Sequence, residues 1–309
     1  MSLYRETYMK KVNLIHNPGA GDGDHEKKSL LELLKKEGYE CRYFSTKKKG
    51  WEKFKSHADL LVVAGGDGTV RKVAGEILKR KLYNRPYSIG VLPLGTANNI
   101  ATTLGMGGKV EKVIRSWETN TLADFDIGRL RKVPEHKFFL ESFGYGLFPA
   151  LIEKMKDVED DDNQSPEERL GMALEKLQRI IHTMAAKQCS ITIDDKDYSG
   201  KFLMVEVMNT PSIGPNLCIS PRSHPGDGQF EVVIVKDSDR KKLAAYVAGL
   251  KKAKSCIFDL TVIKGRNIKI VSELAPVHCD DELVNLPSDS EVSIILKKSA
   301  LHFLGSAKD

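Results

Sequence analysis

Short apolar runs alternate with amphipathic segments over the first third of the chain. The apolar runs are typical of buried strands and lie at residues 12–17, 39–45, 59–64 and 87–94. The segments between and after them carry helical spacing and lie at 25–38, 51–57, 70–78, from 97 onward, and at 110–119. Alternating units of this length indicate a mostly parallel sheet with helical crossovers.

The pattern changes after Ala123, where short strands separated by turn residues replace this alternation. Strands are predicted at 124–131, 137–146, 189–195, 201–209, 228–236, 267–273, 275–281 and 290–296. Helical segments at 148–155 and 166–186 interrupt them, and the acidic run 158–163 predicts a loop between the two. We therefore predict an α/β domain at 1–123 and an antiparallel, β-rich domain at 124–309, whose last residues stay there or pack back on the first domain.

Composition places the chain among ordinary globular proteins. It has 309 residues, of which 41% are hydrophobic and 29% charged, enough for a sizeable core. The net charge of +6 favours an anionic partner but lacks the dense basic character of a nucleic-acid-binding protein. The cluster Lys47–Lys49 is either a solvated face or a surface attracted to anionic lipid headgroups.

Cysteine usage and hydropathy bound the cellular setting. The five cysteines are scattered and form no C-x-x-C pair, which favours reduced thiols and a cytoplasmic location and argues against structural zinc. No apolar stretch approaches the length of a membrane span. We therefore expect any work at a membrane to be peripheral.

The turn Gly65-Gly66-Asp67-Gly68-Thr69 carries the strongest chemical signal in the chain. It follows a buried strand and precedes a helix. Glycines allow a ligand to approach the backbone and allow positive φ, and the start of the helix presents free N–H groups to an anion. Asp67 would repel a phosphate unless a cation such as Mg²⁺ stood between them. The turn therefore predicts a nucleotide and metal site.

Two further loops follow predicted strands. One runs from Asn17 to Gly23, and the other spans 92–99, where Thr96 and Asn98 are good helix N-cap residues. Ligands of parallel sheets bind beyond the carboxyl ends of the strands, so we expect both loops near the Gly65–Thr69 turn. The G-x-G-x-x-G and Walker A patterns are absent, which argues against a Rossmann dehydrogenase and a P-loop enzyme.

The segments GGDGTVRKV and PLGTANNIATTLG, with Asn17-Pro18-Gly19 upstream, closely resemble the diacylglycerol kinase catalytic domain family. That family includes bacterial lipid kinases and the related sphingosine and ceramide kinases. The resemblance continues through DFDIG, FLESFGYGLFPALI, GDGQFEVVIV and HCDDE, at 124–128, 139–152, 226–235 and 278–282. It implies an N-terminal Rossmann-like parallel-sheet nucleotide-binding domain and a C-terminal antiparallel β-sandwich domain, as in NAD kinases and diacylglycerol kinases.

The resemblance also implies roles for individual residues. ATP phosphates would be held by Asn17, Gly65, Gly66, Asp67, Gly68, Thr69, Thr96 and Asn98. Mg²⁺ would be anchored by Asp67, with Asp126 joining through water, and Asp227 would help to form a structural metal site. Asp280 would be the general base for the lipid hydroxyl, with Glu282 beside it. Phosphoryl transfer depends mainly on positioning and charge neutralisation, and these residue types supply both.

Two positions depart from the family pattern. Asn99 stands where many members have an aspartate of the metal network, so the site has one carboxylate fewer. Asp281 stands where the D-G-E motif has glycine, so the loop lacks a residue tolerant of positive φ. The base is therefore either Asp280 or Asp281.

The resemblance predicts an ATP- and Mg²⁺-dependent lipid kinase with its active site in a cleft between the domains. Diacylglycerol is the leading acceptor, giving phosphatidic acid, and a sphingoid base is an alternative. A NAD kinase and a catalytically weakened lipid- or nucleotide-binding regulator are the competing hypotheses. The expected partner is a lipid at an anionic membrane surface, with a homodimer left open. The helix at 167–186 either packs in the core or covers a lipid tunnel.

Overall fold

The computed structural model divides the chain into two compact units. It describes residues 10–21, 26–54, 58–80, 87–156, 166–214, 216–250, 260–273, 276–287 and 289–305. Unit 1 comprises Met1–Phe125 and Ser299–Asp309, and unit 2 comprises Asp126–Lys298. The acidic run predicted as a loop lies outside the described residues.

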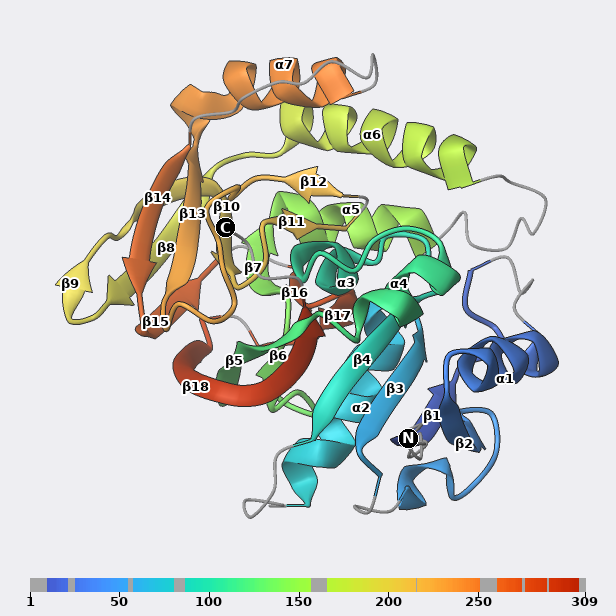
Figure 1. Ribbon diagram of the computed structural model, residues 1–309. Helices are drawn as coiled ribbons and strands as arrows, with labels where there is room; N and C mark the ends of the chain where they lie inside the picture. The colour runs from blue at the N-terminus through green and yellow to red at the C-terminus, as the bar shows by residue number, and fades with distance from the viewer. Residues whose placement is uncertain are drawn as a thin grey trace, which may run out of the picture. The chain divides into compact units, whose positions relative to one another are not determined.

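Unit 1 is built on a parallel sheet. The strands β1 (Lys10–His16), β2 (Tyr39–Ser45), β3 (Leu60–Gly65) and β4 (Ser88–Pro93) lie in the order β2–β1–β3–β4. The last part of β18 (Glu291–Gly305) pairs in parallel with β4 through His302 and Phe303. The end of the chain therefore completes the sheet of the unit that contains its beginning (Figure 1).

Helices cover the sheet of unit 1. They are α1 (Lys27–Lys36), α2 (Asp67–Lys79), α3 (Asn99–Thr103) and α4 (Val110–Ser116), with a short 3-10 helix at Trp51–Lys53. Every residue of β3 is buried, and α2 turns Val70, Val73 and Ala74 toward the core. Each valine or leucine side chain buried in this way contributes about 1.5–3 kcal/mol, so β3 and α2 are held mainly by their apolar faces.

Unit 2 is built from antiparallel strands. They are β5 (Thr121–Arg131), β6 (Phe138–Phe139), β7 (Ser142–Gly146), β8 (Lys187–Ile193), β9 (Lys196–Asp197), β10 (Gly200–Met208), β11 (Ser212–Ile213), β12 (Leu217–Cys218), β13 (Phe230–Lys236), β14 (Thr261–Gly265), β15 (Asn267–Ser272), β16 (Val277–Cys279), β17 (Glu282–Val284) and the first part of β18. The main order is β17–β16–β7–β10–β8–β15–β18, and β13 pairs with both β10 and β14. β5 begins in unit 1 and crosses the boundary at Phe125.

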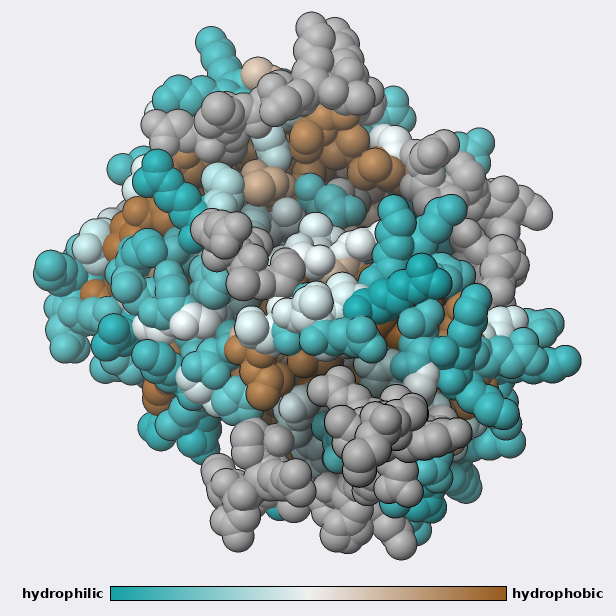
Figure 2. Space-filling model, viewed as in Figure 1, coloured by the Kyte–Doolittle hydropathy of each residue, from teal (hydrophilic) through white to brown (hydrophobic). Residues whose placement is uncertain are grey.

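Three helices, α5 (Leu147–Lys156), α6 (Pro166–Thr183) and α7 (Arg240–Leu250), cover one face of β10 and β13. Leu203, Met204 and Met208 of β10 pack against this helical layer, whereas Val205 and Val207 face a second core formed by the strands. β10 is therefore buried on both faces, which explains its nearly continuous apolar sequence. Apolar side chains also reach the surface around α6, where Leu170 is 39% exposed (Figure 2).

The predicted fold class, α/β followed by an antiparallel β-rich domain, is confirmed, and the differences are local. The helix predicted from residue 97 is the single short turn Asn99–Thr103, and the strand predicted at 275–281 is the first arm of the β16–β17 hairpin. β14 was missed because its sequence TVIKG shows little apolar alternation and four of its five residues are not buried. Over the described residues, no helix combines the length and apolarity needed to cross a bilayer.

Candidate functional site

The β3–α2 turn and the turn after β4 are in backbone contact in unit 1. A Cβ atom added to Gly95 would overlap Cα of Gly66, and one added to Gly65 would lie 2.5 Å from Oγ1 of Thr69. None of these three glycines has positive φ, so the freedom of glycine to adopt it is not used here. Gly66 and Gly95 are required because the two turns approach too closely for side chains, and Gly65 is required because Thr69 packs against it.

Asp67 joins the same two turns through its carboxylate. Oδ2 accepts the N–H of Asn99 at 2.9 Å, and Oδ1 accepts the N–H of Ile100 at 3.0 Å. These N–H groups belong to the first turn of α3, which otherwise leaves them without helical partners. Asp67 therefore caps α3 from another element. The buried Asn99 presents its main chain to Asp67, so an aspartate at this position would bring a second negative charge close to the first.

Asn17 connects the end of β1 to the Gly65–Thr69 turn. Its Nδ2 donates to Oγ1 of Thr69 at 3.2 Å, and its Oδ1 accepts the N–H of Gly19 at 3.2 Å. Asn98 holds its own turn, since Oδ1 accepts the N–H of Gly95 at 2.9 Å while φ of Asn98 is 50°. Thr96 lies in that turn with an exposed side chain. The structure thus gathers the predicted phosphate-binding residues of unit 1 at the carboxyl ends of β1, β3 and β4.

Lys47 is a basic residue at this place, which the sequence analysis named as part of a basic cluster but did not assign to this site. The β1–β2 register pairs His16 with Ser45, so Lys47 follows β2 at the level where the Asn17–Gly19 loop follows β1. A Cβ atom on Gly19 would lie only 2.9 Å from Nζ of Lys47, which places the ammonium group over this loop. Parallel pairing of β1 with β2 was the signal that could have identified it.

Asp280 lies in the β16–β17 turn of unit 2 and is only 5% exposed. Its Oδ1 accepts the N–H groups of Leu140, Glu141 and Ser142 at 3.0, 2.8 and 3.3 Å, while Oδ2 accepts that of Leu140 at 3.2 Å. φ of Asp280 is 55°, so the left-handed residue of this turn is Asp280 and not Asp281, where the glycine of the family motif stands. The missing glycine therefore puts no strain on Asp281.

The other two carboxylates of this hairpin differ from Asp280 in exposure. Asp281 is exposed, and so is Glu282, whose Oε2 lies 3.7 Å from Nδ1 of His136. Of the three, only Asp280 is buried and held by main-chain donors. The structure therefore separates two candidates for the base that the sequence could not tell apart.

A buried row of side chains lies beneath this hairpin. Cross-strand pairing places Gly144 of β7 between Glu206 of β10 and His278 of β16. Nε2 of His278 is 2.7 Å from Oε1 of Glu206, and both side chains are fully buried. Burial alone lowers the pKa of His278, but the Glu206 carboxylate and Asp280 together outweigh this effect, and the pKa of His278 is raised.

The remaining predicted metal ligands lie around a turn before β13. Asp126 is fully buried, and its Oδ2 accepts the N–H of Gly228 at 2.8 Å. Asp227 accepts the N–H of Gln229 at 2.9 Å and lies 3.4 Å from Nζ of Lys264, which also lies 3.2 Å from Oε1 of Glu231. Over the described residues no group of three His, Cys, Asp or Glu side chains gathers in a way that could hold a metal ion. The cation beside Asp227 is thus the Lys264 ammonium, whose pKa the hydrogen bond with Glu231 raises.

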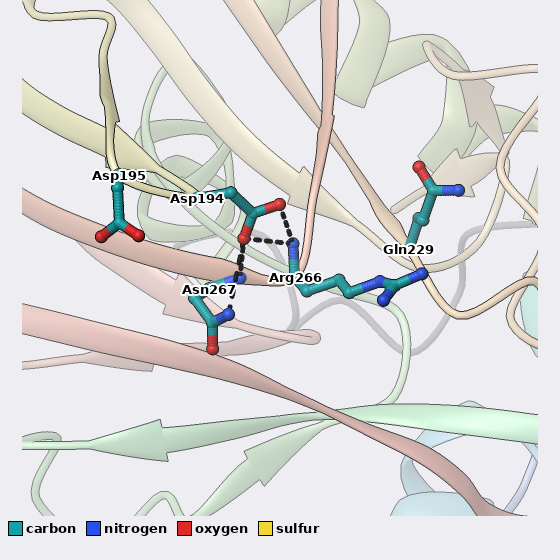
Figure 3. A pocket seen from close by; sticks show the side chains of 5 residues that line it. All are labelled: Asp194, Asp195, Gln229, Arg266 and Asn267. Atoms are coloured by element: carbon teal, nitrogen blue, oxygen red, sulfur yellow. Dashed lines mark hydrogen bonds between the residues drawn. The ribbon is translucent and has the colours of Figure 1, made fainter.

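A surface pocket on the far side of this turn contains none of the predicted site residues. It is lined by Asp194, Asp195, Gln229, Arg266 and Asn267 (Figure 3). Asp194 accepts the main-chain N–H groups of Arg266 and Asn267, and Nε of Arg266 donates to the carbonyl oxygen of Gly228 at 2.9 Å. These charged groups are therefore engaged in holding loops together, including the loop that binds Asp126.

Two family models together match most of this chain. Residues 11–130 match the model of the diacylglycerol kinase catalytic domain, and residues 156–294 match that of the YegS C-terminal NAD kinase beta sandwich-like domain. A diacylglycerol kinase of Bacillus subtilis (strain 168) is 28% identical over 89% of this chain and 90% of its own.

Two solved structures share the fold. A diacylglycerol kinase from Bacillus anthracis str. Sterne superimposes with a TM-score of 0.72 at 21% identity, covering 96% of this chain and 98% of its own. An NAD kinase from Archaeoglobus fulgidus in complex with ATP has a TM-score of 0.52 at 13% identity, covering 96% of this chain and 94% of its own. At these identities the superpositions establish the fold alone.

Proposed function

Because the chain belongs to the diacylglycerol kinase catalytic domain family, we propose that it transfers the γ-phosphoryl group of ATP to a lipid hydroxyl. Diacylglycerol is the leading acceptor, with phosphatidic acid as the product. The observation that carries the proposal is the contact between the two glycine turns of unit 1, with Asp67 bonded across them and Asn17 bonded to Thr69 of the first turn. Loops at the carboxyl ends of parallel strands suit phosphate groups, since main-chain N–H groups and the start of α2 face the same place.

In unit 1, some residues would bind ATP directly and others hold the binding loops in position. Free N–H groups at the start of α2 would bind phosphate oxygens, and Thr96 presents an exposed hydroxyl. Asn17 and Asn98 hold the loops in position through their bonds to Thr69 and Gly95. The Lys47 ammonium supplies a positive charge at the same edge, which offsets part of the phosphate charge.

The donor set at Asp67 fits Mg²⁺. Proteins hold this ion through one or two carboxylates together with substrate phosphates and water, so a cluster of three acidic side chains is not required. Each oxygen of Asp67 accepts one main-chain N–H, and a carboxylate oxygen has two acceptor lone pairs. When bound, Mg²⁺ would neutralise charge on the transferring phosphoryl group. Asp67 would hold it directly or through water, whereas Asp126 and Asp227 remain predicted ligands.

Asp280 is the better candidate for the base in unit 2. Its Oδ1 accepts three main-chain N–H groups, whereas Oδ2 accepts that of Leu140 at 3.2 Å, and we assign Oδ2 to the lipid hydroxyl proton. A base must be held within hydrogen-bond reach of the proton that it removes, and the buried turn provides such a fixed position. The exposed Asp281 has no comparable set of main-chain donors among the described residues.

A panel of acceptors tests the proposal. Purified wild-type protein with Mg-ATP is presented with diacylglycerol, a sphingoid base and NAD, and transfer of labelled phosphate is measured for each. We expect transfer to diacylglycerol and its loss in the D67A variant. NADP formation would favour the NAD kinase hypothesis, for which the shared fold is the supporting observation. Nucleotide binding without transfer to any acceptor, beside an active control kinase, would favour a regulator.

A further inference from the structure

The Asp280 turn contains three features that each cost free energy. A histidine–glutamate pair is fully buried, a non-glycine residue has φ of 55°, and a glycine interrupts the central strand β7. Buried ion pairs rarely repay their desolvation, left-handed non-glycine residues are strained, and glycine weakens a strand. All three features lie close together in unit 2, which indicates that they hold the Asp280 turn in position.

Gly144 is the residue that makes the pair possible. A Cβ atom at this position would overlap the Glu206 carboxylate, so the Glu206 side chain crosses β7 directly over the glycine. The cross-strand register leaves no other route from β10 to β16 at this level, because β7 lies between the two strands. Oε2 of Glu206 is buried and has no hydrogen-bond partner among the described residues, so the contact with His278 is the polar interaction of this carboxylate.

His278 transmits this contact to Asp280. Its Nδ1 lies 2.6 Å from the main-chain oxygen of Asp280, and a carbonyl oxygen only accepts, so Nδ1 carries the proton. Nε2 then faces Glu206, and the ring is fixed from both sides. Phe148 of α5 packs edge-on against the ring, with centroids 4.9 Å apart, and closes the remaining side.

The turn is thereby held at two points. The main-chain oxygen of Asp280 is held by His278, and its carboxylate is held by the N–H groups of residues 140–142. A residue with positive φ needs such support, since its backbone would otherwise relax. We propose that Glu206 and His278 are positioning residues that hold Asp280 in its left-handed conformation and so aim Oδ2 at the acceptor hydroxyl. The catalytic part of this proposal rests on the proposed function, whereas the structural part does not.

The E206Q variant tests the proposal and leaves the size of the side chain unchanged. Its matched control is E231Q, because Glu231 is also buried, at 1% exposure, lies in the neighbouring strand β13 and pairs with Lys264 instead of the Asp280 turn. Hydrogen exchange at the amides of Leu140, Glu141 and Ser142 reports directly on their bonds to the Asp280 carboxylate. We expect E206Q to accelerate exchange at these amides and to lower kcat for the lipid, each about tenfold, with KM for ATP unchanged.

The outcomes separate the positioning role from the proposed function. If E206Q matches E231Q in both exchange and kcat, or if kcat falls without faster exchange at residues 140–142, the positioning role is overturned. If the wild type transfers phosphate to no lipid and yet exchange rises in E206Q alone, the positioning role stands and the proposed function fails. The H278N variant, which retains a side-chain donor for the Asp280 oxygen, should show exchange closer to the wild type than E206Q if that bond is the link.

Discussion

The Asp67 turn of unit 1 and the Asp280 turn of unit 2 each hold a carboxylate in a fixed position, but through different contacts. In both, a carboxylate accepts main-chain N–H groups from a distant segment, residues 99–100 for Asp67 and 140–142 for Asp280. Asp67 remains half-buried beside glycines that let two backbones touch, whereas Asp280 is buried and held by a side-chain pair beneath it.

The two turns show two ways in which the position of a carboxylate can be fixed. Unit 1 uses the close approach of two turns, and a short glycine pattern encodes each turn locally. Unit 2 uses side chains from β7, β10 and β16, which only the fold brings together. Substitutions in the second region should therefore disturb packing more, and substitutions in the first should disturb nucleotide binding more.

Replacing Gly144 with alanine should have the largest effect. The new methyl group would overlap the buried Glu206 carboxylate, and we expect the free energy of unfolding to fall by about 3 kcal/mol or more. Chemical denaturation followed by circular dichroism measures the change. G171A is the control, because Gly171 of α6 has open space around it, and there alanine should stabilise the helix by about 0.5–1 kcal/mol. Equal stability of G144A and wild type would contradict the close packing of the Glu206 carboxylate over Gly144.

Replacing Asp67 with asparagine should come next. An amide accepts through one oxygen only, so one of the two bonds to α3 is lost, and we expect unfolding of unit 1 to become about 1–3 kcal/mol easier. E76Q is a matched control in the same helix, since Glu76 forms only an exposed pair with Lys79. An unchanged unfolding midpoint in D67N would remove the capping role and leave Asp67 with ligand binding alone.

Lys47 offers a smaller effect, confined to unit 1. Loss of its ammonium group should raise KM for ATP about tenfold, equivalent to about 1.4 kcal/mol, with kcat little changed. K49A is the control, because Lys49 is an exposed member of the same cluster. The K47A effect should shrink at high salt, as expected for a charge near the surface. Identical KM values of K47A and K49A for ATP would show that Lys47 belongs to a solvated face and does not contribute to ATP binding.

The stability of unit 2 should depend on pH through His278. Because the folded pKa of His278 is raised, its contribution is fully present below the unfolded pKa of about 6.5 and is lost as pH rises through the folded value. The loss amounts to about 1.4 kcal/mol for each unit by which the pKa is raised. Denaturation curves at several pH values should show this decline in the wild type and a weaker one in E206Q. A decline of the same size in both would assign the effect to another group.

The parts of the molecule that were predicted correctly are those that local sequence patterns encode. The apolar run at 60–63 and the helical spacing that follows it gave β3 and α2, and the strand-rich texture after Ala123 gave the second domain. Both signals lie within a dozen residues, a distance over which hydrophobic periodicity is informative.

Features that depend on contacts between distant segments could not be predicted from the sequence. The contact between Gly66 and Gly95 was not predicted, because nothing local shows that two turns will touch. Glu206 reads as one polar residue within an apolar strand, and its partner His278 lies far away in the chain. Likewise, the left-handed residue was expected at 281 from the motif, whereas the hydrogen bonds made by Asp280 place it at 280.

The most direct measurement is transfer of labelled γ-phosphate from Mg-ATP to diacylglycerol in mixed micelles by the wild type, D280N and D281N. The account predicts labelled phosphatidic acid from the wild type and from D281N, and a rate at least about a hundredfold lower from D280N with unchanged ATP binding. Equal rates from D280N and wild type, or loss of transfer in D281N alone, would contradict the assignment of the base. No labelled lipid from the wild type would contradict the account as a whole.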